Sequence, residues 1–221
     1  MLIVAVGLAR EARIVAAPGV KVVVGACDAA KLREALSAAM DHDTAAILSF
    51  GLAGALSPML HTGDCVVASA VHVGQRSLYA DERWTAAIKE RLPATLTAPI
   101  LGMDSIVDSA REKRRQFART GAAAVDTESH IVAGMAAERG LPFAAIRVIT
   151  DTAAANLPPA ALTAIGPNGE TKFWRVLGSV LLSPGQIPLL MRTGSDARAA
   201  FRVLLRCRKR LGPGFAAPDF G

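Results

Sequence analysis

The sequence predicts an α/β domain built on a central, mostly parallel sheet. Short apolar runs rich in β-branched residues alternate with amphipathic segments of helical spacing along most of the chain. The chain has 221 residues, of which 52% are hydrophobic and 20% charged, so it can bury a sizeable core and is not a disordered chain. The run at 64–71 follows the run at 45–50 with no helix between them, and we therefore expect the sheet to be mixed there.

The apolar runs are the expected strands and the amphipathic stretches are the expected helices. In order, the strands are Leu2 to Val6, Lys21 to Gly25, Ala45 to Phe50, Asp64 to Val71, Ala98 to Leu101, Ala122 to Val125 and Phe143 to Thr150. The helices between them are Ala29 to Met40, Glu82 to Arg91, Ser109 to Arg119 and Ser129 to Arg139.

The pattern changes after Asp151. Prolines and glycines at 155–169 predict a loop with a short helix. Helices are expected at 171–182 and 186–192, separated by a break at 183–185, and a last helix is expected at 196–211, capped by Ser195 or Asp196 and stopped at Gly212. We expect one domain over 1–221, with 186–221 as a basic helical extension.

Several classes of protein are excluded by composition. No apolar run approaches the roughly 18 residues of a membrane span, and the opening residues lack the basic start of a signal peptide. The odd number of cysteines, Cys27, Cys65 and Cys207, predicts reduced core thiols and a cytoplasmic protein. The four histidines have no metal-ligand spacing, so we expect no metal and no cofactor.

Two acids indicate a site. Glu128 and Asp151 each follow a short apolar run, and the segment between them is expected to be a helix, a turn and a buried strand. Ligands of open α/β sheets bind at the carboxyl ends of strands, so these two acids can converge on one small molecule. The alternative is that each acid is only a helix cap.

Two further segments follow predicted strands. Small residues at Gly51, Ala53 and Gly54, after Ser49, allow a turn whose backbone approaches a ligand closely, or they serve tight packing. The segment from Gly7 to Arg13 sets Glu11 between two arginines, an arrangement that can orient a water molecule or hold a phosphate. The alternative is a pair of surface charges on a first helical turn.

These motifs, taken in order, resemble those of the purine nucleoside phosphorylase and methylthioadenosine/adenosylhomocysteine nucleosidase family. The resemblance covers about residues 1–154 and rests on the segments Val4 to Glu11, Phe50 to Val67, Gly102 to Ile106, Val125 to Glu128 and Arg147 to Asp151. Within the family the chain looks most like the bacterial hopanoid-associated phosphorylases. The resemblance implies a three-layer phosphorylase-like fold with a mostly parallel, mixed sheet flanked by helices.

The resemblance also implies roles for single residues. Asp151 matches the acid that protonates the leaving purine, and Glu128 matches the carboxylate that holds the ribose hydroxyls, with Thr127 beside it. Glu11 matches the acid that positions the attacking water, with Arg10 and Ala12 as rival positions. Since the leaving base needs a proton and the ribose a nearby anion, we expect a protonated Asp151 and an ionised Glu128.

The remaining implied positions bind the base and the nucleophile. Ile106, Val107 and Asp104 match the base-binding segment, although Ile106 stands where the family has a stacking aromatic residue. The expected phosphate or nucleophile loop consists of Gly7, Arg10, Arg13, Ser49, Gly51, Ala53 and Gly54. The arginine that family phosphorylases place near the glycine loop is absent there, so phosphate and water both stay open as nucleophiles.

The resulting hypothesis is an enzyme that releases adenine from a 5′-substituted adenine nucleoside, with adenosylhopane as the implied substrate. The segment at 72–80 is shorter than in the family, which opens the 5′ side to a bulky substituent. The alternatives are an ordinary methylthioadenosine/adenosylhomocysteine nucleosidase and a nucleoside-binding protein without catalysis. The family's sites imply a homo-oligomer, commonly a dimer.

Basic residues are concentrated near the end of the chain. The segment from Arg192 to Leu211 carries seven basic residues and one acid, which equals the whole net charge of +6. Arg198, Arg202, Arg206 and Arg210 recur every four residues and are expected to share one helix face. We expect this face either to be simply solvated or to contact an anionic membrane surface. Nucleic acid is not an expected partner, since aromatic residues are few in this segment.

Overall fold

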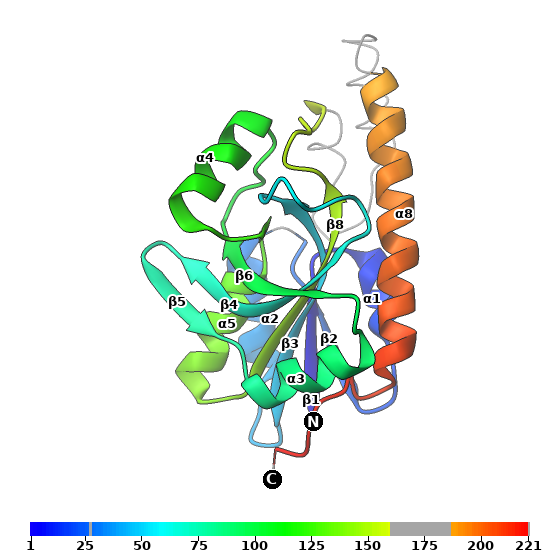
Figure 1. The fold of residues 1–221 in the computed structure, drawn as a ribbon. Coiled ribbons are helices and arrows are strands. Elements are labelled where there is room, and N and C mark those ends of the chain that lie inside the picture. Colours follow the sequence, from blue (N-terminus) through cyan, green and yellow to red (C-terminus); the bar gives the residue numbers. More distant parts are fainter. Residues whose placement is uncertain (27, 160–186, 221) are drawn as a thin grey trace.

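The computed structural model describes residues 1–26, 28–159 and 187–220, and it has three layers with a sheet between two sets of helices (Figure 1). The strands are β1 (Leu2–Val6), β2 (Val20–Val24), β3 (Ala46–Ala55), β4 (Cys65–Val73), β5 (Arg76–Tyr79), β6 (Leu96–Gly102), β7 (Ala124–Asp126) and β8 (Phe143–Asp151). The helices in the described residues are α1 (Ala9–Val15), α2 (Ala29–Ala39), α3 (Glu82–Arg91), α4 (Ala110–Thr120), α5 (Ser129–Arg139) and α8 (Ile187–Leu211).

The sheet is mixed and largely parallel, which confirms the predicted fold class. Its strand order is β2-β1-β3-β7-β6-β4-β5, and β8 pairs with both β3 and β4. Strand β8 is parallel to β3 and antiparallel to β4, while β7 is antiparallel to β3. These pairings close β3, β7, β6, β4 and β8 into a ring, and β2 and β5 lie at the ends of the sheet path.

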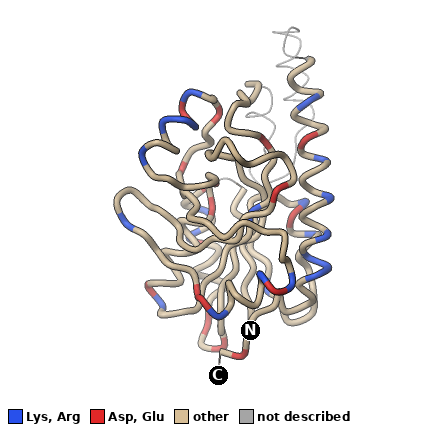
Figure 2. Tube along the Cα trace, viewed as in Figure 1, with Lys and Arg blue, Asp and Glu red and all other residues tan. Residues whose placement is uncertain are grey.

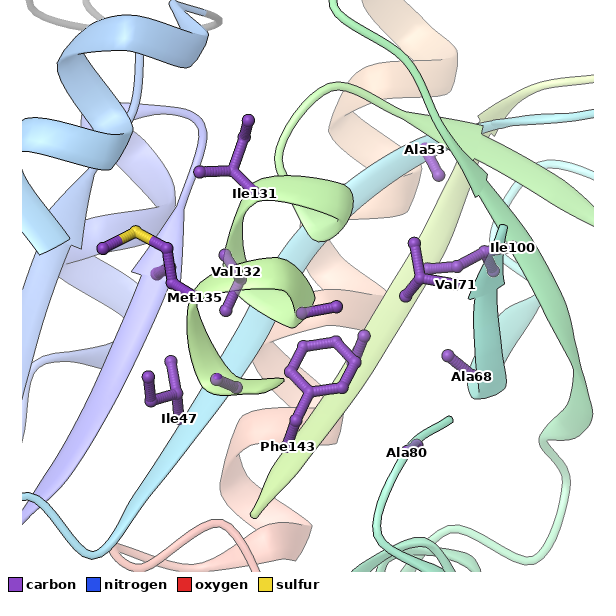
Figure 3. Packing of buried hydrophobic residues seen from close by; sticks show 14 of the residues in the cluster. Ile47, Ala53, Ala68, Val71, Ala80, Ile100, Ile131, Val132, Met135 and Phe143 are labelled. Carbon is purple, nitrogen blue, oxygen red and sulfur yellow. The ribbon is translucent and has the colours of Figure 1, made fainter. Parts of the chain in front are cut away.

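Two large hydrophobic clusters hold five of the described helices to the sheet, and a third, smaller cluster packs against Phe117 of α4. Helices α2 and α5 cover one face, where Ile131, Val132 and Met135 of α5 belong to the same buried cluster as Ile47 and Phe143 (Figure 3). Helices α1, α3 and α8 cover the other face with buried side chains that include Val15, Trp84, Ala200, Phe201 and Leu204. Because α8 contributes several fully buried side chains, its second half is part of the core.

Local signals in the sequence explain most helix ends. Asp28, Asp81 and Ser109 accept a hydrogen bond from a backbone amide in the first turn of α2, α3 and α4. Gly121 and Gly140 take the left-handed conformation at the ends of α4 and α5. Helix α5 begins three residues after β7 ends, so its first turn lies at the carboxyl end of a strand.

Helix α1 was not among the expected helices, and three further elements differ from the prediction. Strand β3 continues to Ala55, so Gly51 and Gly54 lie within a strand and not in a turn, because neighbouring β8 pairs with β3 almost to its end. The short strand β5 was not predicted, since its residues include charged and polar side chains and form no apolar run.

The third difference is α8, where a break was expected before Asp196 but one helix runs through. A glycine in a helix costs only about 1 kcal/mol, and the hydroxyl of Thr193 donates to the carbonyl of Leu189, 2.9 Å away. Packing of the second half therefore carries the helix past Gly194, while Gly212 ends it as expected, with a φ of 75°. The expected helix at 171–182 lies outside the described residues, as does most of the expected loop at 155–169.

The cysteines described are Cys65 and Cys207, both buried as free thiols with their sulfur atoms 3.9 Å apart. Cys27 lies outside the described residues. Among the helices that the structure describes, none combines the length and the apolarity of a membrane span.

Candidate active site

A cavity of about 550 Å³ lies where β1, β7 and β8 end and beside the second half of β3. Its polar lining includes Glu11 after β1, Asp126, Thr127 and Glu128 around the end of β7, and Asp151 at the end of β8. Apolar lining comes from Leu52, Ala53, Ile106, Val107, Leu157, Leu189 and Ala197. The first half of α8 thus forms one wall, and the acids of three strand ends lie in one cavity.

Glu11 is a buried acid in the first turn of α1, with 2% of its surface exposed. Its oxygens accept hydrogen bonds from the backbone amides of Gly7, Leu8 and Leu52 at 2.8–2.9 Å. Burial, with the nearby charge of Glu128, raises the pKa of Glu11 to about 7, although these amides oppose the shift. A carboxyl group with this pKa can exchange a proton at neutral pH.

A glycine makes room for this carboxylate. A Cβ atom at Gly51 would lie 2.7 Å from the Oε1 atom of Glu11. Gly51 therefore contacts the Glu11 side chain from β3, and it does not line the cavity itself.

Glu128 precedes α5 and faces the same cavity. The hydroxyl of Thr127 donates to Glu128 Oε1 at 2.6 Å, and Arg147 Nη2 lies 3.9 Å from Glu128 Oε2. A Cβ atom at Gly7 would lie 2.9 Å from Glu128 Oε1, so a side chain there would displace the carboxylate. Glu128 is thus held by Thr127 and Arg147, and Gly7 leaves room for its carboxylate.

A buried polar network under the cavity was not predicted. Arg147 on β8 is 1% exposed and forms an ion pair with Asp126. Its Nη2 atom donates to Ser49 Oγ at 2.6 Å and to Ser129 Oγ at 2.9 Å. Ser49 therefore lies behind the cavity as a partner of this arginine and is not part of the lining. The sequence does carry a signal for this network, which is an arginine within an otherwise apolar strand. Because a charge is buried only when it is paired, such an arginine predicts a buried acid as its partner.

Asp151 has an ion-pair partner that the sequence reasoning missed. The buried ammonium group of Lys113, on α4, donates to Asp151 Oδ2, and the hydroxyl of Thr150 donates to Asp151 Oδ1 at 2.6 Å. The surroundings of Asp151 are therefore not purely apolar. The helical spacing could have indicated that Lys113 is buried. It lies three and four residues before Gln116 and Phe117, which face the protein, and therefore shares their helix face.

The other expected residues divide into two groups. Ile106, Val107, Gly7, Ala53 and Gly54 line the cavity, with Val107 buried and Ile106 at 38% exposure. A Cβ atom at Gly54 would lie 3.1 Å from Asp151 Oδ2, so this glycine leaves room for the acid.

Besides Ser49 and Gly51, three further expected residues lie outside the cavity lining. The guanidinium group of Arg10 stacks 4.1 Å from the centre of the Phe201 ring, and Arg13 is exposed. Each helical residue is rotated by about 100° from its neighbour, so Arg10 and Arg13 point away when Glu11 points inward. The side chain of Asp104 is 81% exposed and contacts His130 at 2.9 Å.

The charges of the cavity are mainly negative. Glu11, Asp126, Glu128 and Asp151 contribute to its lining, and the basic lining residue is Arg192 in the first half of α8, 4.0 Å from Asp196. Such a site stabilises a reacting group that gains positive charge, while the Lys113–Asp151 pair can exchange a proton with a leaving group.

The comparisons with known proteins agree with this geometry. A model of the family described as the phosphorylase superfamily matches residues 3–181. A methylthioadenosine/adenosylhomocysteine nucleosidase from Colwellia psychrerythraea, in complex with adenine, has a similar structure with a TM-score of 0.65 and 16% identity, over 95% of each chain.

Two further solved structures have the same fold. A nucleosidase of this type from S. pneumoniae, with a transition-state inhibitor, has a TM-score of 0.64 and 18% identity over 96% of this chain and 100% of its own. The futalosine hydrolase of Helicobacter pylori has a TM-score of 0.60 and 17% identity over 68% of this chain and 87% of its own. No curated protein sequence matches the chain.

Proposed function

The chain belongs to the phosphorylase superfamily and is a nucleosidase or phosphorylase, and from this premise we propose that it releases adenine from a 5′-substituted adenine nucleoside. The observation that carries the proposal is the convergence of Glu11, Glu128 and Asp151 on one cavity. The structures with a bound adenine and with a transition-state inhibitor belong to nucleosidases of the same fold, which supports the choice of base.

The three acids have separable duties in this proposal. Breaking the bond between the sugar and the base gives the sugar the character of an oxocarbenium ion. Glu128, next to Thr127, accepts hydrogen bonds from the ribose hydroxyls and stabilises that positive charge. Asp151 delivers a proton to the purine, whose other faces contact Ile106 and Val107.

Water is the nucleophile that the site favours. Glu11 lines the cavity with a pKa of about 7, so its ionised form can accept a proton from water. The guanidinium donors of Arg147 bond to Asp126, Ser49, Ser129 and the carbonyl of Ile146, and Arg10 and Arg13 lie outside the lining. Among the described residues that line the cavity, Arg192 is the cation that could hold phosphate, and phosphorolysis is the alternative.

We propose a bulky apolar 5′ substituent, with adenosylhopane as the candidate. Support comes from apolar side chains of α8 at the cavity, Leu189 and Ala197, and from exposed Met191 on the same part of the helix. The second candidate is an ordinary methylthioadenosine/adenosylhomocysteine nucleosidase, which is the activity named for two of the similar structures.

We also propose a peripheral contact with anionic membranes in a cytoplasmic protein. Arg198, Arg202, Arg206 and Arg210 are exposed along α8 (Figure 2), while the opposite side of the helix packs on the core. A contact would therefore be electrostatic, at about 1 kcal/mol per basic residue near the surface. Co-sedimentation with neutral and anionic vesicles at low and high salt tests it, and binding that survives exchange of the four arginines for glutamine would overturn it.

The main test is product analysis. The protein is incubated with methylthioadenosine, adenosylhomocysteine and an adenosine carrying a long 5′-alkyl group, with and without phosphate. We expect free adenine and free ribose derivative, fastest with the alkyl substrate and independent of phosphate. The Asp151→Asn variant is the control, with an expected loss of about 10²–10⁴ in rate. Absence of base release from all three substrates would contradict the proposed function.

We also propose that the protein is a homo-oligomer. Light scattering, which measures the molar mass in solution, tests this.

A further inference from the structure

Helix α4 carries a buried lysine, Lys113, that contacts the cavity acid Asp151. Lys113 has no exposed surface, and its ammonium group has three acceptors, which are Asp151 Oδ2 and the carbonyls of Thr152 and Ala155, the carbonyls both at 3.0 Å. An ammonium group has three donor hydrogens, so every one of them is used. The neighbouring side chains on α4, Glu112 and Arg114, are not buried, so Lys113 alone reaches from this helix to the cavity acid.

Lys113 is not required to hold the segment after β8 against α4. The side-chain oxygen of Asn156 accepts a hydrogen bond from the amide of Ala110 at 2.8 Å, and the amide of Leu157 donates to the carbonyl of Asp108 at 2.7 Å. These bonds fix the same segment without a charge. Burying an ammonium group costs several kcal/mol unless it is paired, so a purely structural role would be served better by an apolar side chain.

The pair matters for the reaction because an ionised Asp151 has no proton to give to a leaving purine. Resting on the proposed function, we propose that Lys113 is a positioning residue that acts through Asp151, holding its carboxylate at the base and supplying the proton that the carboxylate passes on. The sugar–base bond breaks with its electron pair going to the purine, and N7 of the purine takes a proton from Asp151. Asp151 takes a proton from Lys113, which becomes a neutral amine, and Glu11 takes a proton from the attacking water.

The charges balance through this sequence. The ion pair of Lys113 and Asp151 is neutral before proton transfer, and the pair is left as an amine and a carboxylate when the neutral base departs. Once the base has left the cavity, Glu11 releases the proton of the attacking water to the solvent, and Asp151 takes a proton from the solvent and passes it to Lys113. Among the described residues, the other charged groups that line the cavity are Glu11, Asp126, Glu128, Arg192 and Asp196, and burial raises the pKa of Glu11 to about 7.

The test is the pH dependence of adenine release by Lys113→Met, expressed as the ratio of variant to parent activity so that the shared effect of Glu11 cancels. At neutral pH we expect a loss of about 10²-fold or more, the usual contribution of a general acid. The ratio should rise as the pH falls, since Asp151 then takes its proton from solution. Lys113→Arg keeps the charge but cannot release a proton, so it should stay low over the whole pH range.

Controls separate this role from a structural one. Lys21→Met removes a lysine whose ammonium group donates to the carbonyl of Ala39 at 2.7 Å, outside the cavity lining, and should leave activity unchanged. If Lys113→Met does not fold, Lys113→Gln, which keeps donors for the two carbonyls, carries the same test.

Three results would overturn the relay while leaving the proposed function intact. These are a Lys113→Met variant within a few-fold of the parent at every pH, a loss of constant size at every pH, and full activity in Lys113→Arg. A parent protein that releases no base would contradict the proposed function itself and, with it, the relay.

Discussion

Glu11 is subject to opposing influences on its pKa. Burial and Glu128 raise the pKa, the amides of Leu8 and Leu52 lower it, and the balance is a value of about 7. Since the proposed base must be ionised, we expect the rate of adenine release to rise with pH through about 7. Glu11→Gln should be nearly inactive at all pH values. Measurement of kcat/KM against pH tests this, and a parent profile that is flat from pH 5 to 8 would contradict it.

The same shift predicts how stability depends on pH. Because the folded pKa of Glu11 lies above its ordinary value of 4.5, the folded protein holds this proton more tightly than the unfolded chain does. This stabilisation, on the order of 3 kcal/mol, is present below pH 4.5 and is lost as the pH rises through 7. Urea unfolding of the parent and of Glu11→Gln at pH 5 and pH 8 should show a smaller difference between the two pH values in the variant.

Glu128 should show its contact with the ribose through a substrate comparison. Hydrogen bonds to a charged acceptor are worth about 1.5–3 kcal/mol. Glu128→Gln should therefore raise the activation free energy for cleavage of the ribonucleoside by roughly that amount. A 2′-deoxy substrate lacks one partner of the carboxylate and should lose much less. If kcat/KM falls equally for the two substrates, Glu128 does not bind the ribose hydroxyls.

Residues that follow strands were predictable, but their charged partners on other elements were not. Glu11, Glu128 and Asp151 stand at strand ends, and strand ends meet in an α/β sheet. Lys113 is within a helix rich in charged residues, and nothing local distinguishes it from solvent-exposed lysines. Arg147 pairs with an acid 21 residues away, and only the folded sheet brings the two together.

At the scale of elements, α8 offers a direct stability test. Gly194 lies within the helix, is exposed, has no positive φ, and has open space where a Cβ atom would be. We expect Gly194→Ala to stabilise the protein by up to about 1 kcal/mol, through the higher helix propensity of alanine. Thermal unfolding measures the effect. A destabilised variant would show that the helix is interrupted at this point in solution.

Elements with strong local patterns were predicted nearly to the residue. Strand β1 and helices α3 and α5 have the expected bounds, since apolar periodicity and caps agree there. The extension of β3 depends on β8 beside it, and β5 exists because β4 offers it a partner for a hairpin. The extension of β3 and the formation of β5 thus both depend on pairing with another strand, which cannot be predicted from the residues of either segment alone.

At the scale of the whole molecule, helix α8 lies between an acidic cavity and a row of exposed arginines. The first half of α8 lines an acidic cavity, and its arginines are exposed along the helix (Figure 2). The net charge of +6 thus describes the outer surface near α8 and not the substrate site.

The ring of strands also sets the order in which the molecule can assemble during translation. Its last member, β8, must insert between β3 and β4, which leave the ribosome far earlier, so both wait with exposed edges until residue 151 has emerged. Chaperones that shield strand edges should therefore bind nascent chains ending before Phe143 and release chains that include β8. Because β8 carries both Arg147 and Asp151, the step that closes the ring also brings Arg147 to Asp126 and Asp151 to the cavity, whose wall is completed when α8 follows.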